Sequence, residues 1–446
     1  MSFPLQRVVT RSALVAILAM PACAANPSGP AQVSDSNPPS SGQAGEIDAG
    51  PTEGIDDADG DKPSSTDSGR GLPKPKDAGP AVTSGRDAAA VASDGAAAGN
   101  GSPTDAQIAA TDGSASAEPD ETAGLWISPT GSDQAPGTKD KPLQSLKAAH
   151  DLATPGSTIW VSPGTYALSD TVKISRSGQP DKPILLSAAP GARPVFDFSA
   201  QARGASAARG LQISGDYWHI RGIEVINAGD NCINISGSNN TIERVVIHGC
   251  CDTGLQITAD GSAAGDATRA AHNTILNTDS YENYDTQNQG ENADGFAAKL
   301  HIGPGNVFRG CRSWNNSDDG WDLFASNDVV VIENSWAIAN GKIGASQNNT
   351  NGDGNGFKLG GAPALGDADE GGAVHQVKNC VSLGNKACGF VRNNNPELPQ
   401  LTNCSGQGDG AGAYCKVTSD GSATVSMTAA QAIAATRDAD GNLPPM

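Results

Sequence analysis

The chain has 446 residues, a formal net charge of −20 and only 4% aromatic residues. An acidic balance of this size argues against nucleic-acid binding, which requires clustered positive charge. The 324 residues from position 123 onward are enough for one large domain.

The first 23 residues are typical of a bacterial export signal. Arg7 and Arg11 precede the apolar run Ala13–Met20, which is too short to span a bilayer in the mature protein. Two processing routes stay open. Ala22-Cys23-Ala24 fits ordinary secretion, whereas Met20-Pro21-Ala22-Cys23 resembles a lipoprotein box. We therefore predict a secreted protein or an outer-surface lipoprotein of a bacterium, the latter attached to the membrane through lipidated Cys23.

Residues 24–122 are rich in Ala, Gly, Ser, Pro and Asp. They include 17 acidic and 5 basic residues but almost no aromatic or branched apolar ones. Such a segment cannot bury enough apolar surface to offset the entropy of ordering, so we predict a disordered acidic linker. The folded domain is predicted at residues 123–446.

The predicted domain opens with short strands and one helix. Trp126–Pro129, Thr158–Val161 and Pro183–Leu186 are apolar runs of strand length. Between the first two, Leu143–Leu152 has apolar residues at helical spacing. This isolated helix is expected to cap the N-terminal end of the domain.

A four-residue pattern, X-Gly-Φ-X with Φ a large apolar residue, occurs seven times, counting two looser copies. Equivalent turn positions recur mostly at 22–24 residues, with insertions in two coils. Short strands at this period predict an all-β fold, a right-handed parallel β-helix (solenoid) with an N-terminal capping helix. A leucine-rich repeat would need Leu at fixed positions in every coil, which this chain lacks. The copies are Asn231–Asn234, Thr253–Gln256, Asp294–Ala297, Asp319–Asp322, Asn355–Lys358, Cys388–Val391 and Gly412–Cys415.

Eight cysteines lie in the predicted domain. An even number in an exported chain suggests disulfides. Cys380 and Cys404 are 24 residues apart, about one coil, so one prediction is a bridge between neighbouring coils. Buried free thiols stacked in the core are the alternative. Because Cys-x-x-Cys and His-rich spacings are absent, zinc is not expected.

Four aspartates fall on neighbouring copies of the repeat. Asp318 and Asp319 precede a strand in which Trp321 is expected to point inward, so Asp322 should point outward. One coil earlier, Asp294 occupies the column of Asp319. Four carboxylates at one exterior spot repel each other unless a cation is bound, and oxygen ligands in this number suit Ca²⁺. A solvated Asp-rich turn without an ion is the alternative.

Lys358 occupies the next coil, in the outward column of Asp322. Neighbouring coils are about 4.8 Å apart, so its amine should lie close to the cation. A salt bridge with Asp322 is the simpler interpretation. The other is a Brønsted base, with a pKa lowered by Ca²⁺ and an alkaline pH optimum. A cation beside a base suits β-elimination on a uronate, in which the cation neutralises the sugar carboxylate and the base removes the C5 proton.

Three motifs carry a resemblance to a known family. They are Asn292–Leu300, Asn316–Phe324 and Asn355–Gly360, and they resemble the pectate lyases of polysaccharide lyase family nine. The resemblance implies a right-handed parallel β-helix, a Ca²⁺ cofactor and a polygalacturonate (pectin) substrate. It implies Lys358 as the catalytic base. It implies as Ca²⁺ ligands Asp294, Asp318, Asp319, Asp322 and the main-chain carbonyl of Leu323.

Two basic residues are further candidates for substrate binding. Lys299 lies within the first motif. Arg392 follows Val391 where members of the family tend to carry Asp-Gln, a departure that bears on substrate contacts. An arginine at this place could pair with a sugar carboxylate, although a solvated surface arginine is the simpler interpretation.

The expected partner is an acidic polysaccharide, and the protein is expected to be a monomer. Two other function classes are the alternatives. A polygalacturonase-type β-helix hydrolase would use paired carboxylates, but the Gly-His-Gly of such enzymes is missing, the nearest match being Ile247-His248-Gly249. A non-catalytic Ca²⁺-binding surface protein would not need Lys358 beside the acids. Ultraviolet absorbance of an unsaturated product separates elimination from both.

Overall fold

A computed structural model describes residues 123–445 except 206, 260–267, 301, 344–346, 362–371 and 423. The predicted export signal, Cys23 and the predicted linker therefore lie outside the described residues. Within the described part of the chain, no helix is both long enough and apolar enough to cross a membrane.

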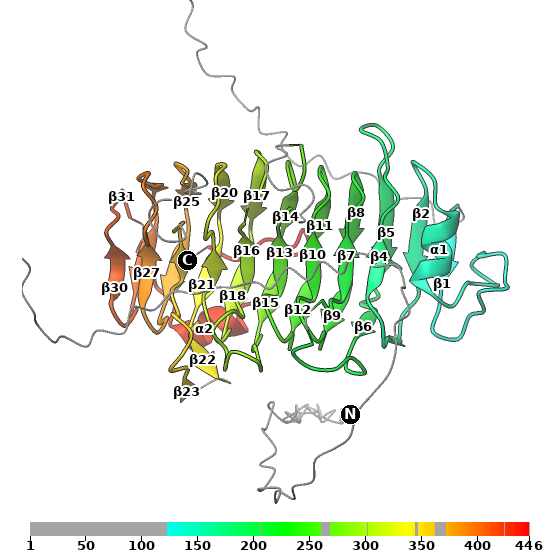
Figure 1. The fold of residues 1–446 in the computed structure, drawn as a ribbon, viewed down its shortest axis with the longest axis horizontal. Helices are drawn as coiled ribbons and strands as arrows, with labels where there is room; N and C mark the ends of the chain where they lie inside the picture. Colours follow the sequence, from blue (N-terminus) through cyan, green and yellow to red (C-terminus); the bar gives the residue numbers. More distant parts are fainter. Residues whose placement is uncertain are drawn as a thin grey trace, which may run out of the picture. The chain divides into compact units, whose positions relative to one another are not determined.

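Three parallel sheets line the domain, and each coil of the chain contributes about one strand to each sheet (Figure 1). Consecutive strands belong to different sheets, so each strand pairs with its equivalent one coil away. In one such column, Asp322 lies opposite Ala297 of the preceding coil and Lys358 of the following coil. The predicted parallel β-helix is confirmed.

Among the described residues, the first sheet has 11 strands: β1 (Leu125–Ile127), β2 (Thr158–Val161), β5 (Ile184–Ala188), β8 (Trp218–Arg221), β11 (Thr241–Glu243), β14 (Thr274–Leu276), β17 (Asn306–Arg309), β20 (Val330–Glu333), β25 (Gln376–Lys378), β28 (Gln400–Thr402) and β31 (Ser419–Asp420). The second has nine: β4 (Val172–Ile174), β7 (Leu211–Ile213), β10 (Ile233–Ile235), β13 (Leu255–Ile257), β16 (Phe296–Ala298), β19 (Trp321–Asp322), β24 (Phe357–Lys358), β27 (Cys388–Val391) and β30 (Gly412–Cys415). The third also has nine: β3 (Thr165–Ala167), β6 (Val195–Asp197), β9 (Glu224–Ile226), β12 (Val246–His248), β15 (Asp279–Tyr281), β18 (Arg312–Trp314), β21 (Trp336–Ile338), β26 (Val381–Leu383) and β29 (Ser405–Gln407). A small antiparallel hairpin pairs β22 (Lys342–Ile343) with β23 (Gln347–Asn348).

The predicted capping helix is present as α1 (Leu146–Leu152), at the β1–β2 end of the stack (Figure 1). It begins later than the predicted Leu143 because Ser145 is the N-cap, with its side chain accepting a hydrogen bond from the Ala148 amide. Leu146 and Ala149 are buried against the coils. The helix thereby covers the end of the apolar core.

The Φ residues of the repeat form an aromatic stack inside the solenoid. The ring centroids of Phe296 and Trp321 are 4.9 Å apart, and those of Trp321 and Phe357 are 4.7 Å apart. Phe390 continues the stack 4.7 Å beyond Phe357. Because these rings are fully buried, the residue after each Φ faces the outer side of the second sheet.

A ladder of asparagines stiffens the turn that leads into the second sheet. The Nδ2 of Asn283 donates to the Oδ1 of Asn316 over 2.8 Å, and Asn316 donates likewise to Asn340 over 3.0 Å. Asn340 donates to Asn385 over 2.9 Å. Asn316 stands two residues before Asp318, so this ladder fixes the turn that carries the paired aspartates.

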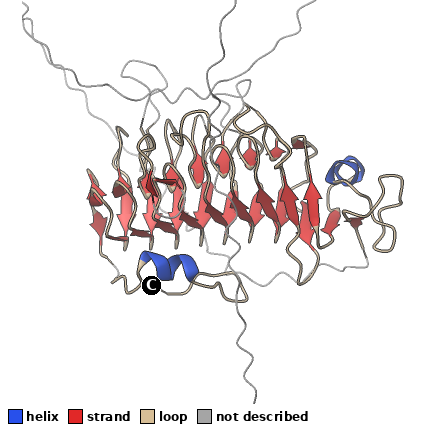
Figure 2. Cartoon of the chain, turned by 90° about the horizontal axis from the view of Figure 1, so that it is seen from below, coloured by secondary structure: helices blue, strands red, loops and turns tan. Residues whose placement is uncertain are grey.

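A C-terminal segment covers the third sheet, and its helix was not predicted from the sequence. Its helix α2 (Ala429–Ala434) lies against one face of the strands (Figure 2). Asp279 holds this segment against the sheet. Its carboxylate contacts Arg312 at 3.0 Å and Arg437 at 2.6 Å. Arg312 also donates a hydrogen bond to the carbonyl of Ala432. The ion-pair network is largely buried.

Asp279→Ala is expected to lower the free energy of unfolding by about 3–5 kcal/mol, because it leaves two largely buried guanidinium groups without their counter-charge. Urea unfolding followed by tryptophan fluorescence measures the loss. A matched control is Glu333→Ala, which removes the surface pair between Glu333 and half-exposed Arg309 and should cost about 0–1 kcal/mol. Equal losses in the two variants would contradict a structural role for the buried network.

Within the part of the chain that the structure describes, two disulfides are present, and neither joins the predicted pair. Cys232 bonds Cys250, and Cys388 bonds Cys415. The predicted bridge between Cys380 and Cys404 is wrong: both remain buried thiols. Each of these thiols donates to main-chain carbonyls, the Cys404 Sγ to Val377 over 3.3 Å, so the alternative of stacked core thiols is confirmed.

Candidate functional site

The four aspartates and Lys358 meet on the outer side of the second sheet. Asp294 precedes β16, Asp318 and Asp319 precede β19, and Asp322 lies within β19. The amide of Asp319 donates to the Asp294 Oδ1 over 3.0 Å, which couples the two coils directly. Three of the four predicted aspartates, Asp294, Asp318 and Asp319, thus bring their carboxylate oxygens together, and Asp322 is connected to them through Lys299 and Lys358.

The carboxylates are less exposed to solvent than expected for a cluster on the exterior of the sheet. Asp294 and Asp319 are 0% exposed and Asp318 is 4% exposed, although they belong to the outer side of the sheet. One oxygen from each of these three carboxylates lies within 4.8 Å of the others. The residues thus form a buried, oxygen-rich group.

Burial changes the titration of the cluster. It raises the pKa of Asp294 to about 7, against the opposing effect of Lys299. Burial also raises the pKa values of Asp318 and Asp319 well above their ordinary range, and neighbouring carboxylates raise them further. For Asp322, burial raises the pKa, but Lys358 and Lys299 outweigh it and hold the pKa below its usual value.

The donor set fits a hard cation. Asp319 Oδ2 is buried and accepts no hydrogen bond from the described residues, and the Lys358 Nζ lies 3.6 Å from it. Several close carboxylate oxygens are the ligands that Ca²⁺ takes in proteins. The carbonyl of Leu323, also predicted as a ligand, accepts a 3.3 Å hydrogen bond from the Ser326 amide, and its role toward a cation stays a prediction.

Lys358 lies against the cluster, as its column predicted. Its Nζ is 3.6 Å from Asp319 Oδ2 and 3.7 Å from Asp322 Oδ1, and it sits 5.7 Å over the Phe324 ring. Burial alone would lower the pKa of this amine, but the carboxylates, Asp322 foremost, hold the pKa well above its ordinary value. Without a compensating charge, the amine is therefore protonated.

Three contacts of the site were not predicted from the sequence. The Thr253 hydroxyl donates to Asp294 Oδ2 over 3.0 Å, and the Asn355 side chain donates to Asp319 Oδ1 over 3.0 Å. Both residues stand in the first position of the repeat, which could have indicated them. Asp353 Oδ2 lies 3.6 Å from the Lys358 Nζ and is 56% exposed. Asp353 belongs to a turn outside the repeat, so no periodic signal marks it.

The two candidate substrate-binding residues differ in placement. Lys299 is buried inside the aspartate cluster, with its Nζ 3.5 Å from Asp294 Oδ2 and 3.3 Å from Asp322 Oδ2. Arg392 instead braces its own loop by donating to the carbonyls of Asn395 and Pro396, each over 2.6 Å. A contact of either residue with substrate stays a prediction.

Comparison with known proteins extends these observations. The family model described as "Pel9A-like, right handed beta helix region" matches residues 125–422. Pectate lyase L of Dickeya chrysanthemi is 41% identical over 277 residues, covering 60% of this chain and 61% of that protein. Pectate lyase L of Paenibacillus polymyxa (strain SC2) is 43% identical over 307 residues, covering 67% and 66%. The chain thus spans less than two thirds of the length of these relatives.

Solved structures agree with the fold. The crystal structure of pectate lyase Pel9A matches with a TM-score of 0.61 and 33% identity, covering 73% of this chain and 88% of that one. A rhamnogalacturonan lyase matches with a TM-score of 0.57 at 23% identity, which supports the fold alone. The right-handed sense predicted for the solenoid agrees with the matching family model.

Proposed function

The chain belongs to the Pel9A-like right-handed β-helix family, and from this premise we propose that it is a Ca²⁺-dependent lyase that cleaves polygalacturonate by β-elimination. The observation that carries the proposal is the juxtaposition of the Lys358 amine with the buried carboxylate group. Lys358 Nζ lies within 3.7 Å of two of the candidate ligands, Asp319 and Asp322. An oxygen-rich cation site beside a potential base is what elimination on a uronate requires.

Asp294, Asp318, Asp319 and Asp322 are proposed to hold the cation, with the carbonyl of Leu323 as a further ligand. When bound there, Ca²⁺ would offset the carboxylate charge, lower the pKa of Lys358 and neutralise the carboxylate of a bound uronate. The coils hold these ligands rigidly, because the asparagine ladder and the Thr253 hydroxyl restrain the turns that carry them.

Lys358 is proposed as the base. Its neutral amine accepts the C5 proton of the uronate, and the electron pair of that C–H bond forms the C4–C5 double bond. The 4-linked sugar leaves with the electrons of the C4–O bond and takes a proton from water. Since only the neutral amine can accept the proton, the rate should rise with pH until Lys358 is deprotonated, giving an alkaline optimum.

We also propose that the protein works outside the cytoplasm, where its polymeric substrate would be found. The two disulfides support export, because such bonds persist in oxidising compartments. Mass spectrometry of the mature N-terminus distinguishes a lipid on Cys23 from release of the protein.

Incubation with polygalacturonate and Ca²⁺ is expected to raise ultraviolet absorbance in step with new reducing ends, because each elimination leaves one unsaturated uronate at the new non-reducing end. The test follows absorbance and reducing ends in the same sample. New reducing ends without absorbance would indicate hydrolysis, and the absence of both would indicate a non-catalytic Ca²⁺-binding protein. Either result would overturn the proposed function.

A further inference from the structure

A second cluster on the same face repeats the arrangement of the aspartates two coils toward the N-terminus. By strand register, Thr253 stands two coils before Asp319, and Gln256 stands two coils before Asp322. Asn231 likewise stands two coils before Asp294. The positions match, but the chemistry differs, since amides and a hydroxyl replace carboxylates.

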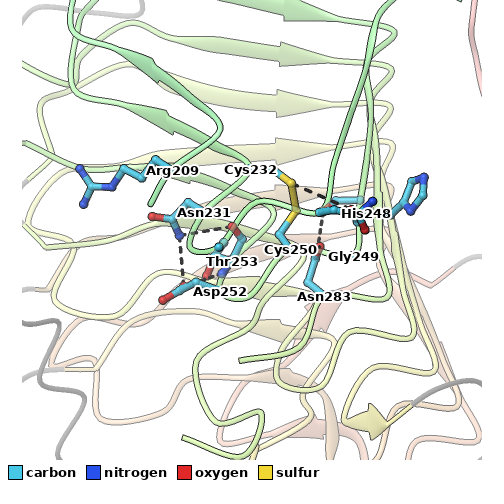
Figure 3. The surroundings of a disulfide bond; sticks show 12 residues. Arg209, Asn231, Cys232, His248, Gly249, Cys250, Asp252, Thr253 and Asn283 are labelled. Atoms are coloured by element: carbon cyan, nitrogen blue, oxygen red, sulfur yellow. Dashed lines mark hydrogen bonds between the residues drawn. A yellow bond between two sulfur atoms is a disulfide. The ribbon is translucent and has the colours of Figure 1, made fainter. Parts of the chain in front are cut away.

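We call Asn231, Asn234 and Gln256 the amide cluster. Asn234 and Gln256 lie opposite each other in neighbouring strands, and all three side chains are 0–1% exposed, as deeply placed as the aspartates. Some of their atoms are bonded: Asn231 Nδ2 donates to Asp252 Oδ1 over 3.1 Å and to the Thr253 carbonyl over 3.3 Å (Figure 3). The cluster is therefore an ordered feature of the sheet.

Each member of the amide cluster nevertheless keeps an unused polar atom. Asn231 Oδ1, Asn234 Nδ2 and Gln256 Nε2 are buried and have no hydrogen-bond partner among the described residues. Leaving such groups buried and unpaired is energetically unfavourable. One acceptor and two donors on one face of the sheet therefore have no hydrogen-bond partner among the described residues.

The surroundings hold the amide cluster rigidly. The disulfide between Cys232 and Cys250 anchors the residue next to Asn231 and the turn that leads to Asp252 (Figure 3). Thr253 belongs to that turn, and its hydroxyl reaches Asp294 over 3.0 Å. The amide cluster is thus built into the same framework as the aspartate cluster.

An amide offers a donor and an acceptor without charge, so this group suits hydroxyl groups rather than a cation. Equivalent positions of the two clusters are two coils apart, a distance of about 10 Å, and a polysaccharide lying along the solenoid would pass over both. We propose that the amide cluster is a subsite that hydrogen-bonds the hydroxyl groups of another sugar unit in the strand being cleaved. This proposal rests on the proposed polysaccharide lyase function.

The test is Gln256→Met, which keeps the side-chain length and removes its hydrogen-bonding groups. On long polygalacturonate, kcat/KM should fall about three- to tenfold, the value of one neutral hydrogen bond, and the loss should appear in KM. On a series of oligogalacturonates, the loss should shrink as the chain shortens. Calorimetric Ca²⁺ affinity should stay at the wild-type value. Asn234→Leu, at the opposite position, should reproduce the pattern.

Gln376→Met makes the same substitution on the first sheet, away from this face, and serves as the matched control. A loss independent of chain length, no loss in either variant, or weakened Ca²⁺ binding would overturn the subsite. If wild-type protein forms unsaturated product while the variants behave in one of these ways, the subsite alone fails. If wild-type protein forms none, the proposed function fails as well.

Discussion

Lys358→Arg should abolish nearly all turnover while Ca²⁺ and substrate binding persist. Arginine stays protonated at any working pH and cannot accept the C5 proton, although it preserves the positive charge beside Asp322. General-base catalysis contributes about 10²–10⁴-fold to a rate, so a loss of at least this size is expected, and Lys358→Ala should match it. Initial rates of absorbance increase measure turnover, and calorimetry measures Ca²⁺ affinity.

If Lys358 only forms a salt bridge, Lys358→Arg should keep most of its activity. The distances of 3.6 Å to Asp319 and 3.7 Å to Asp322 are also those of an ordinary buried ion pair, which arginine could maintain. An Arg variant with most of its activity would therefore refute the base while leaving the fold and the cation site untouched. Lys378→Arg, at an exposed position of β25, provides the control and should leave activity unchanged.

The repeat made the fold and the core of the candidate site predictable. Once the X-Gly-Φ-X copies were aligned, Asp322 and Lys358 had to fall in one column, and the strand register places them opposite each other. Alternation along the strand also placed Trp321 inside, where it stacks between Phe296 and Phe357. Periodicity carries this information because each coil repeats the same local geometry.

Features outside the periodicity were not accessible in this way. The pairing of Cys232 with Cys250 depends on how two turns approach each other, and cysteine spacing alone does not determine it. Asp353 reaches Lys358 from a turn next to an insertion, and α2 packs on the third sheet through contacts distant in sequence. The burial of the aspartates was also missed, because a strand pattern indicates which face a side chain takes but not what covers that face.

The metal-free protein should lose stability as pH rises, and Ca²⁺ should restore it. Burial raises the folded-state pKa of Asp294 to about 7, whereas the carboxyl titrates near 3.8 when unfolded. A raised carboxyl pKa contributes stability that is complete at low pH and is lost as pH rises through the folded value. In chelator, the melting temperature should therefore fall between about pH 4 and 7 as this group ionises.

Asp319→Asn tests whether the cluster exists to hold the ion. Burial and neighbouring carboxylates raise the pKa of Asp319, so removing its charge relieves repulsion and should leave the chelated protein at least as stable as wild type at pH 8. With Ca²⁺ at 100 times its Kd, wild type should gain about 2.7 kcal/mol, and the variant much less at the same concentration because a charged ligand is gone. Turnover should fall whenever Ca²⁺ is not bound. Wild type should lose turnover on chelation, and the variant should lose turnover at limiting Ca²⁺.

Thermal melts and absorbance assays over a Ca²⁺ titration measure both effects. Asp420→Asn, at an exposed position of β31, should respond to Ca²⁺ as wild type does. In chelator, Asp319→Asn should be at least as stable as wild type, and in Ca²⁺ it should be less stable. Asp420→Asn should not show this reversal. Full wild-type activity in excess chelator, with no metal bound to the protein, would refute the cation site. The buried carboxylates would then support catalysis without a bound cation to balance their negative charge.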